Sequence, residues 1–403
     1  MKTAWLGLAT LTFVWACGGD GGTGQPPNTA GTSGGGSGNA GTPATGGSGT
    51  SGSGTAAGTS AGGSGTSGSV TGGSTSGGSG TGGSGGSGSG TGGSGGSGGS
   101  APSSVCPAGP FDAPVFGTPV RVEGVPPADA FNNMNNDFTN IEGAVWVGDA
   151  LYVSEISGKG NNPPPSRILK ITADGTVTVA VPDSGTNGLA INAAGELFGA
   201  KHSDGSISKI ALPGGTATPV ASMYMGKRFG SPNDLTIHSN GTIYFTDPSW
   251  QAPMPNPQTE TRAYIVKPGG MPEPIAGQFS QPNGITLSKN QDFLYVGGNQ
   301  LRKYPVMADG SLGAGTEFVA GGGSDGMVLD CADNLYITKD GVQIYDKTGQ
   351  KIGATLTVGM GGTQVTNVAF GGADRKTLYV TGQGSGMQKG LFKVPMNVPG
   401  YPY

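Results

Sequence analysis

The chain has 403 residues, a net charge of −4 and a pI near 5.2, and its 83 glycines are far above ordinary usage. The acidic balance and the lack of any basic run argue against nucleic acid as a partner. No apolar stretch reaches the length of about 18 residues that a membrane-spanning helix needs.

The first residues have the architecture of a secretion signal. One Lys precedes an apolar run from Trp5 to Ala16, and Cys17 follows directly. This arrangement resembles the lipobox of bacterial lipoproteins, although Trp15 replaces the usual small residue. The resemblance implies a signal peptide over residues 1–16 and a lipid on Cys17. The protein is then exported and anchored to a bacterial membrane, at the outer membrane or cell surface; a plain secreted protein is the alternative.

Residues 17–104 consist almost entirely of Gly, Ser, Thr, Ala and Pro. No charged residue occurs between Asp20 and Asp112, and Val70 is the only large apolar residue within residues 17–104. Such a segment cannot bury enough apolar surface to fold, so we expect a disordered linker with a reach of roughly 50 Å. Residues 105–403 have an ordinary globular composition and are expected to form one all-β domain.

The predicted domain contains six copies of one pattern, in which a polar residue precedes a short apolar strand, a turn and a second strand. The copies are IEGAVWVGDALYVSE, TNGLAINAAGELFGA, PNDLTIHSNGTIYFTD, PNGITLSKNQDFLYVGG, SDGMVLDCADNLYITK and TNVAFGGADRKTLYVTG. Their leading polar residues are Glu142, Asn187, Asn233, Asn283, Asp325 and Asn367. Six repeats that are spaced as these leading residues are, each with pairs of strands, predict a six-bladed β-propeller with four-stranded blades. A β-sandwich would not explain six copies in register.

The sixth copy runs out of sequence before a fourth strand. The segment 118–124, TPVRVEG, lies before the first copy and belongs to no other blade. We therefore expect this N-terminal strand to complete the sixth blade and close the ring, which removes exposed sheet edges.

The leading residues should converge on the central channel, because the first strand of each blade lines it. Their side chains offer only oxygen ligands and include two carboxylates, Glu142 and Asp325, which suits a hard cation such as Ca²⁺. Asn-Gly and Asp-Gly are also common turn dipeptides, but Asn233 precedes Asp and Asn367 precedes Val. Strand alternation predicts that Asp234 points away from Asn233 and braces neighbouring backbone.

The stretch GKRFGSPNDLTIHSNGTIYFTDPSW, together with IEGAVW, QPNGITLS, SDGMVLD and TNVAFGGADRKTLYVT, resembles the gluconolactonase, senescence-marker-protein and luciferin-regenerating-enzyme family over about residues 118–394. The resemblance implies a six-bladed propeller with a divalent cation in the channel, Ca²⁺ being expected and Mg²⁺, Mn²⁺ or Zn²⁺ alternatives. The implied ligands are Glu142, Asn233, Asn283 and Asp325. Asn187 and Asn367 would line the channel and contact water or substrate.

The activity that this resemblance implies is Ca²⁺-dependent opening of a sugar lactone or a similar ester. Asp325 is the implied base that accepts the proton of the attacking water, with Glu142 as the alternative base. The expected protein is a monomer that acts on a small molecule and meets the membrane only through its lipid. A non-catalytic, surface-anchored propeller that binds a small molecule or protein is the alternative.

Several positions depart from the family pattern. His202 is followed by Ser-Asp-Gly, where many bacterial members have Gly-Asn-Arg-Arg. Ser231 stands where animal members tend to have Arg, and Asn367 where diisopropylfluorophosphatase has His. His202 is expected either at the channel mouth or as the partner of a buried backbone group. Cys106 and Cys331 form either a disulfide, which an exported chain permits, or two free thiols.

Overall fold

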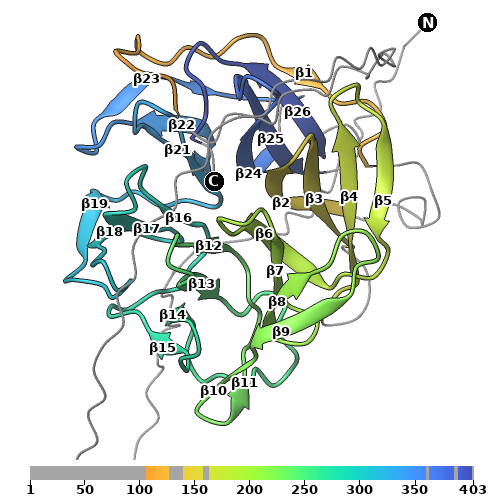
Figure 1. Ribbon diagram of the computed structural model, residues 1–403, viewed down its shortest axis with the longest axis vertical. Helices are drawn as coiled ribbons and strands as arrows, with labels where there is room; N and C mark the ends of the chain where they lie inside the picture. Colours follow the sequence, from red (N-terminus) through yellow and green to blue (C-terminus); the bar gives the residue numbers. More distant parts are fainter. Residues whose placement is uncertain (1–105, 127–138, 158–162, 360–362, 385–388, 402–403) are drawn as a thin grey trace, which may run out of the picture. The chain divides into compact units, whose positions relative to one another are not determined.

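The structure is a computed structural model and describes residues 106–126, 139–157, 163–359, 363–384 and 389–401. Six antiparallel four-stranded sheets follow one another around a central axis (Figure 1). The predicted six-bladed propeller is therefore confirmed. Within the described part of the chain, no helix is long and apolar enough to cross a bilayer.

The first three blades use consecutive strands, each sheet running from the channel outward. Blade 1 contains β2 (Thr139–Val147), β3 (Ala150–Ser157), β4 (Ser166–Thr172) and β5 (Val177–Val181). Blade 2 contains β6 (Thr186–Ile191), β7 (Leu197–Lys201), β8 (Ser206–Ile210) and β9 (Ala217–Ala221). A two-stranded ribbon follows, formed by β10 (Met223–Tyr224) and β11 (Lys227–Arg228). Blade 3 contains β12 (Leu235–Ile237), β13 (Ile243–Asp247), β14 (Arg262–Val266) and β15 (Glu273–Pro274).

The last three blades complete the ring. Blade 4 contains β16 (Ile285–Leu287), β17 (Phe293–Val296), β18 (Leu301–Pro305) and β19 (Thr316–Val319). Blade 5 contains β20 (Met327–Leu329), β21 (Leu335–Lys339), β22 (Gly341–Tyr345) and β23 (Lys351–Leu356). Blade 6 contains β24 (Gln364–Gly371), β25 (Thr377–Gln383), β26 (Gly390–Pro395) and, at its outer edge, β1 (Val120–Arg121).

The hydrophobic core lies between neighbouring blades. In one cluster, Phe198 and Ile207 of blade 2 pack with Phe245 and Tyr264 of blade 3. The rings of Phe245 and Tyr264 stack with their centroids 5.2 Å apart. Large aromatic side chains bury much apolar area, so these contacts fix how each blade sits against the next.

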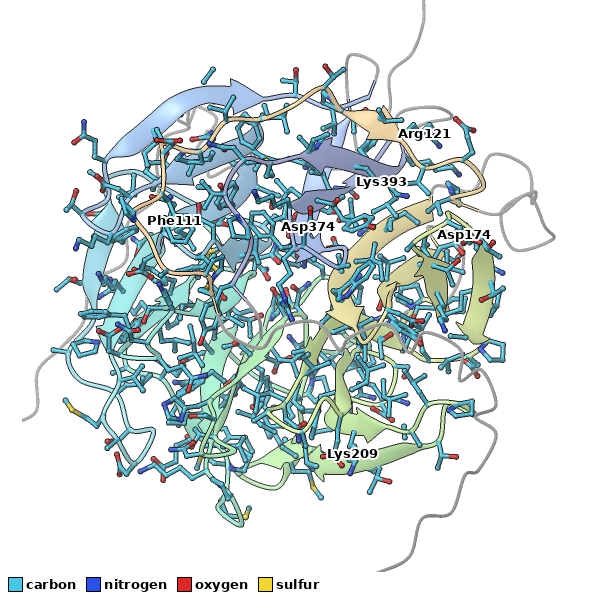
Figure 2. The ribbon with its side chains drawn as sticks, turned by 45° about the horizontal axis from the view of Figure 1, so that its top comes forward. Phe111, Arg121, Asp174, Lys209, Asp374 and Lys393 are labelled. Atoms are coloured by element: carbon cyan, nitrogen blue, oxygen red, sulfur yellow. A yellow bond between two sulfur atoms is a disulfide. The ribbon has the colours of Figure 1, made fainter. Side chains whose placement is uncertain are left out.

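The ring is closed by the N-terminal strand, as expected for residues 118–124. Val120 of β1 pairs with Lys393 of β26, and Arg121 pairs with Phe392. Figure 2 shows Arg121 and Lys393 on these adjacent strands. Closure therefore joins the first and last described strands of the chain in one sheet.

Cys106 and Cys331 form a disulfide with their Cα atoms 5.5 Å apart, which decides between the two expectations for these residues. Cys331 lies in the turn after β20, whereas Asp325 lies before β20. The disulfide is therefore at the end of the inner strand opposite to the leading polar residues. The C-terminal segment crosses the same end, where Cys331 N donates to Pro399 O at 2.8 Å.

Candidate functional site

In blades 3, 4 and 5 the leading residue is held at the start of the inner strand by the same backbone contact. Asn233 N donates to Thr246 O at 2.9 Å, and Asp325 N donates to Thr338 O at 2.8 Å. Each bond joins the leading residue to the second strand of its own blade. The repetition places the leading residues at equivalent positions around one end of the channel.

A second backbone bond links blade 2 to blade 3 and blade 5 to blade 6. Gly188 N donates to Asn233 O at 2.5 Å, and Gly326 N donates to Thr366 O at 2.7 Å. The residue after one leading position therefore binds the leading carbonyl of the following blade. By this contact the leading residue of blade 6 is Thr366, so the assignment of that position to Asn367 was wrong by one residue.

Asn367 occupies the position that Asp234 has in blade 3. A Cβ built on Gly188 would lie 2.6 Å from Asp234 Oδ1, and one on Gly326 would lie 2.6 Å from Asn367 Oδ1. Each carboxyl or amide oxygen also accepts a hydrogen bond from the next backbone N–H. Asn367 does line the channel, but one layer below the leading ring.

The two carboxyl groups of the ring interact with each other. Burial raises the pKa of Glu142 well above its usual range, and the neighbouring Asp325 carboxylate raises it further. Burial likewise raises the pKa of Asp325, followed by the charge of Asp234. Only neutral amides oppose these shifts: Asn140 Nδ2 donates to Glu142 Oε1 at 3.1 Å, and Asn283 hydrogen-bonds Asp325.

This donor set fits a hard divalent cation. The oxygens come from two carboxylates and from amides, which are ordinary Ca²⁺ ligands, and none of the causes that shift the two pKa values is a cationic side chain. Among the described residues, no group of three His, Cys, Asp or Glu gathers into a metal-binding cluster. A cation bound here would therefore need the amide oxygens of Asn233 and Asn283 as ligands in addition to the carboxylates of Glu142 and Asp325.

Asp234 combines two roles. Its Oδ1 accepts from Leu235 N at 2.9 Å and its Oδ2 from Ile285 N at 3.4 Å, so it braces the backbone of blades 3 and 4 as expected. Its side chain nevertheless lines the channel, which corrects the expectation that it points away from it. Burial raises the pKa of Asp234 to about 7.

Gln251 reaches the ring from outside the repeats. Asn187 Nδ2 donates to Gln251 Oε1 at 3.1 Å, and Gln251 N donates to Ser231 Oγ at 3.2 Å. Gln251 lies in the connection 248–261 between β13 and β14, which is much longer than the equivalent turns at 202–205 and 297–300. That extra length was the available sequence signal, although it does not identify the residue.

His202 is fully buried. Its Nε2 donates to Pro164 O at 2.8 Å, with the tautomer assigned from that carbonyl acceptor. Burial lowers the pKa of His202 to about 4, so the ring is neutral near pH 7. Of the two expectations, the structure has His202 as the partner of a buried backbone group.

A family model described as "SMP-30/Gluconolactonase/LRE-like region" matches residues 140–384. The chain belongs to this family. The matched region contains the whole ring from Glu142 to Thr366 and excludes β1, Cys106 and the C-terminal segment.

Individual relatives agree with membership of the SMP-30/gluconolactonase family. The chain is 28% identical over 278 residues to a gluconolactonase of Zymomonas mobilis, covering 60% of this chain and 75% of that protein. The structure of a gluconolactonase from Xanthomonas campestris matches with 25% identity and a TM-score of 0.55. The match covers 73% of this chain and 100% of that protein. The calcium-binding protein regucalcin from Agrobacterium tumefaciens matches in fold, with 21% identity and a TM-score of 0.52. The match covers 66% of this chain and 92% of that protein.

Proposed function

We propose that this propeller is a Ca²⁺-dependent hydrolase that opens a sugar lactone or a similar ester. The observation that carries the proposal is the pair of repelling carboxyl groups, Glu142 and Asp325, which are flanked by asparagine amides and have no cationic side chain among the groups that shift their pKa values. Two relatives in this family are named as gluconolactonases, which supports a lactone as the substrate class.

In the proposed reaction, the oxygen of water attacks the lactone carbonyl carbon and the ring C–O bond breaks. Glu142, Asn233, Asn283 and Asp325 would hold the cation, which when bound supplies polarisation of the carbonyl and charge for the developing oxyanion. Asp325 accepts the water proton as general base and returns it to the leaving alkoxide, which regenerates the carboxylate of Asp325. Asn187, oriented by Gln251, presents its amide to the lactone.

Chelation tests the proposal directly. We expect EDTA to lower the rate of lactone opening by about 10²-fold or more, because the charge that stabilises the oxyanion is removed, and added Ca²⁺ to restore it. The measurement is hydrolysis of a panel of sugar and alkyl lactones, corrected for spontaneous opening. Full activity in EDTA would contradict a metal mechanism, whereas a protein that binds Ca²⁺ but opens no lactone or ester would indicate the non-catalytic alternative.

We also propose that the protein is an exported lipoprotein anchored through Cys17, which lies outside the described residues. The short apolar run before Cys17 supports this part of the proposal. Cys17→Ala is expected to prevent incorporation of a labelled fatty acid and to move the protein from the membrane to the soluble fraction. Unchanged labelling and fractionation of this variant would rule out the anchor.

A further inference from the structure

The channel continues below the polar ring as a cavity of about 80 Å³ that is lined by both aliphatic and polar side chains. Asp234 and Asn367 lie at its upper end, next to the ring. Inner strands of all six blades form its wall, with side chains that include Val145, Ala190, Leu235, Ile285, Val328 and Val368. Arg375 and Tyr401 contribute to the lining at the opposite end, where the C-terminal segment crosses.

Arg375 is placed at this end by the turn after β24, which Asp374 marks in Figure 2. Its backbone has φ +55°, the left-handed conformation also adopted by Gln291 and Asp333 in the corresponding turns of blades 4 and 5. Arg375 O accepts from Gly400 N at 2.8 Å, which ties the turn to the C-terminal segment. The backbone that carries the Arg375 side chain is therefore held in place beside the cavity.

The guanidinium of Arg375 is not compensated by its surroundings. Its Nε is buried and has no hydrogen-bond partner, and no hydrogen bond or ion pair joins the group to a carboxylate among the described residues. Burial alone shifts its pKa, downward. A half-buried cation with an unsatisfied N–H costs free energy, and a bound carboxylate would satisfy both the charge and the donor.

We propose that this end of the channel is a binding site for a short-chain aliphatic monocarboxylate, with the carboxylate on Arg375 and the alkyl group against the aliphatic side chains of the channel wall. An engineered apolar cavity of about 150 Å³ accommodates benzene, so 80 Å³ suits an alkyl group of a few carbons. The planar guanidinium matches a carboxylate. A phosphate is disfavoured because no second cationic side chain lines the cavity.

The test uses the full-length protein and sodium butyrate, followed by titration calorimetry and ligand-observed NMR. Butyramide has a similar shape without the charge, and sodium chloride controls for ionic strength. We expect butyrate to bind about tenfold or more tightly than butyramide, because a hydrogen bond to a charged group is stronger than one to a neutral group. Equal binding of the two compounds, or no binding of butyrate, would overturn the site.

Two variants locate the site. Arg375→Gln reproduces the residue that Gln291 places in the same left-handed turn position, so it should fold normally and bind butyrate no better than butyramide. Ala190→Leu adds volume to the channel wall and should weaken binding of both compounds. Unchanged butyrate affinity in Arg375→Gln, with wild-type thermal melting, would refute the assignment. None of these measurements uses lactone hydrolysis, so the site and the proposed activity can fail separately.

Discussion

Replacement of Asp325 by Asn is expected to lower kcat/KM for lactone opening by about 10³-fold, within the range that general acid–base groups contribute. The change removes the proposed base and one of the two carboxylates that attract the cation. It should also weaken Ca²⁺ binding, because an amide oxygen carries no formal charge. Kinetics and calorimetric Ca²⁺ titration of the same preparation measure both effects.

The same variant should behave differently when Ca²⁺ is absent. The charges of Asp325 and Glu142 raise each other's free energy in the metal-free ring, so Asp325→Asn should melt at the same temperature as the wild type or higher in EGTA. Asp333→Asn is the matched control, since Asp333 lies in blade 5 beyond the opposite end of β20. Near-wild-type activity and Ca²⁺ affinity in Asp325→Asn would exclude the assigned role.

Cys106→Ser is expected to lower the free energy of unfolding by about 2–5 kcal/mol, because removing the disulfide lets the unfolded chain expand. The loop that the disulfide closes is long, with a sequence separation of 225 residues, which favours the upper part of this range. Changing Cys106 is preferable to changing Cys331, because Cys331 Sγ also lies 3.4 Å from Gly400 O in a buried position.

Urea unfolding of the wild type, with and without reductant, measures this prediction together with the variant. Reduced wild type should match Cys106→Ser, and reductant should leave the variant unchanged. A variant as stable as the oxidised wild type would mean that the disulfide contributes nothing to folding.

The fold could be predicted because its information is repeated. Six copies with the same strand spacing indicate six blades, and the missing fourth strand of the last copy leaves residues 118–124 as its complement. The position of Asn367 could not be settled in this way. A polar residue before an apolar run fits two registers, and contacts in the structure, such as the bond from Gly326 N to Thr366 O, distinguish them.

The candidate site was predicted in part for the same reason. Glu142, Asn233, Asn283 and Asp325 lie within repeats, so comparison among the copies identifies them. Gln251 belongs to an irregular loop that is much longer than the equivalent turns of blades 2 and 4, and Arg375 depends on how the C-terminal segment crosses the channel. Whether two cysteines meet depends on the path of the chain between them, which composition does not reveal.

The disulfide also determines how the domain would carry tension. The sequence continues for 105 residues before Cys106, and β1, which closes the ring, has only two residues paired with β26. A pull from the N-terminal side reaches the covalent Cys106–Cys331 link before it reaches Val120. The force is then transmitted to blade 5, and it does not act to separate the paired strands β1 and β26.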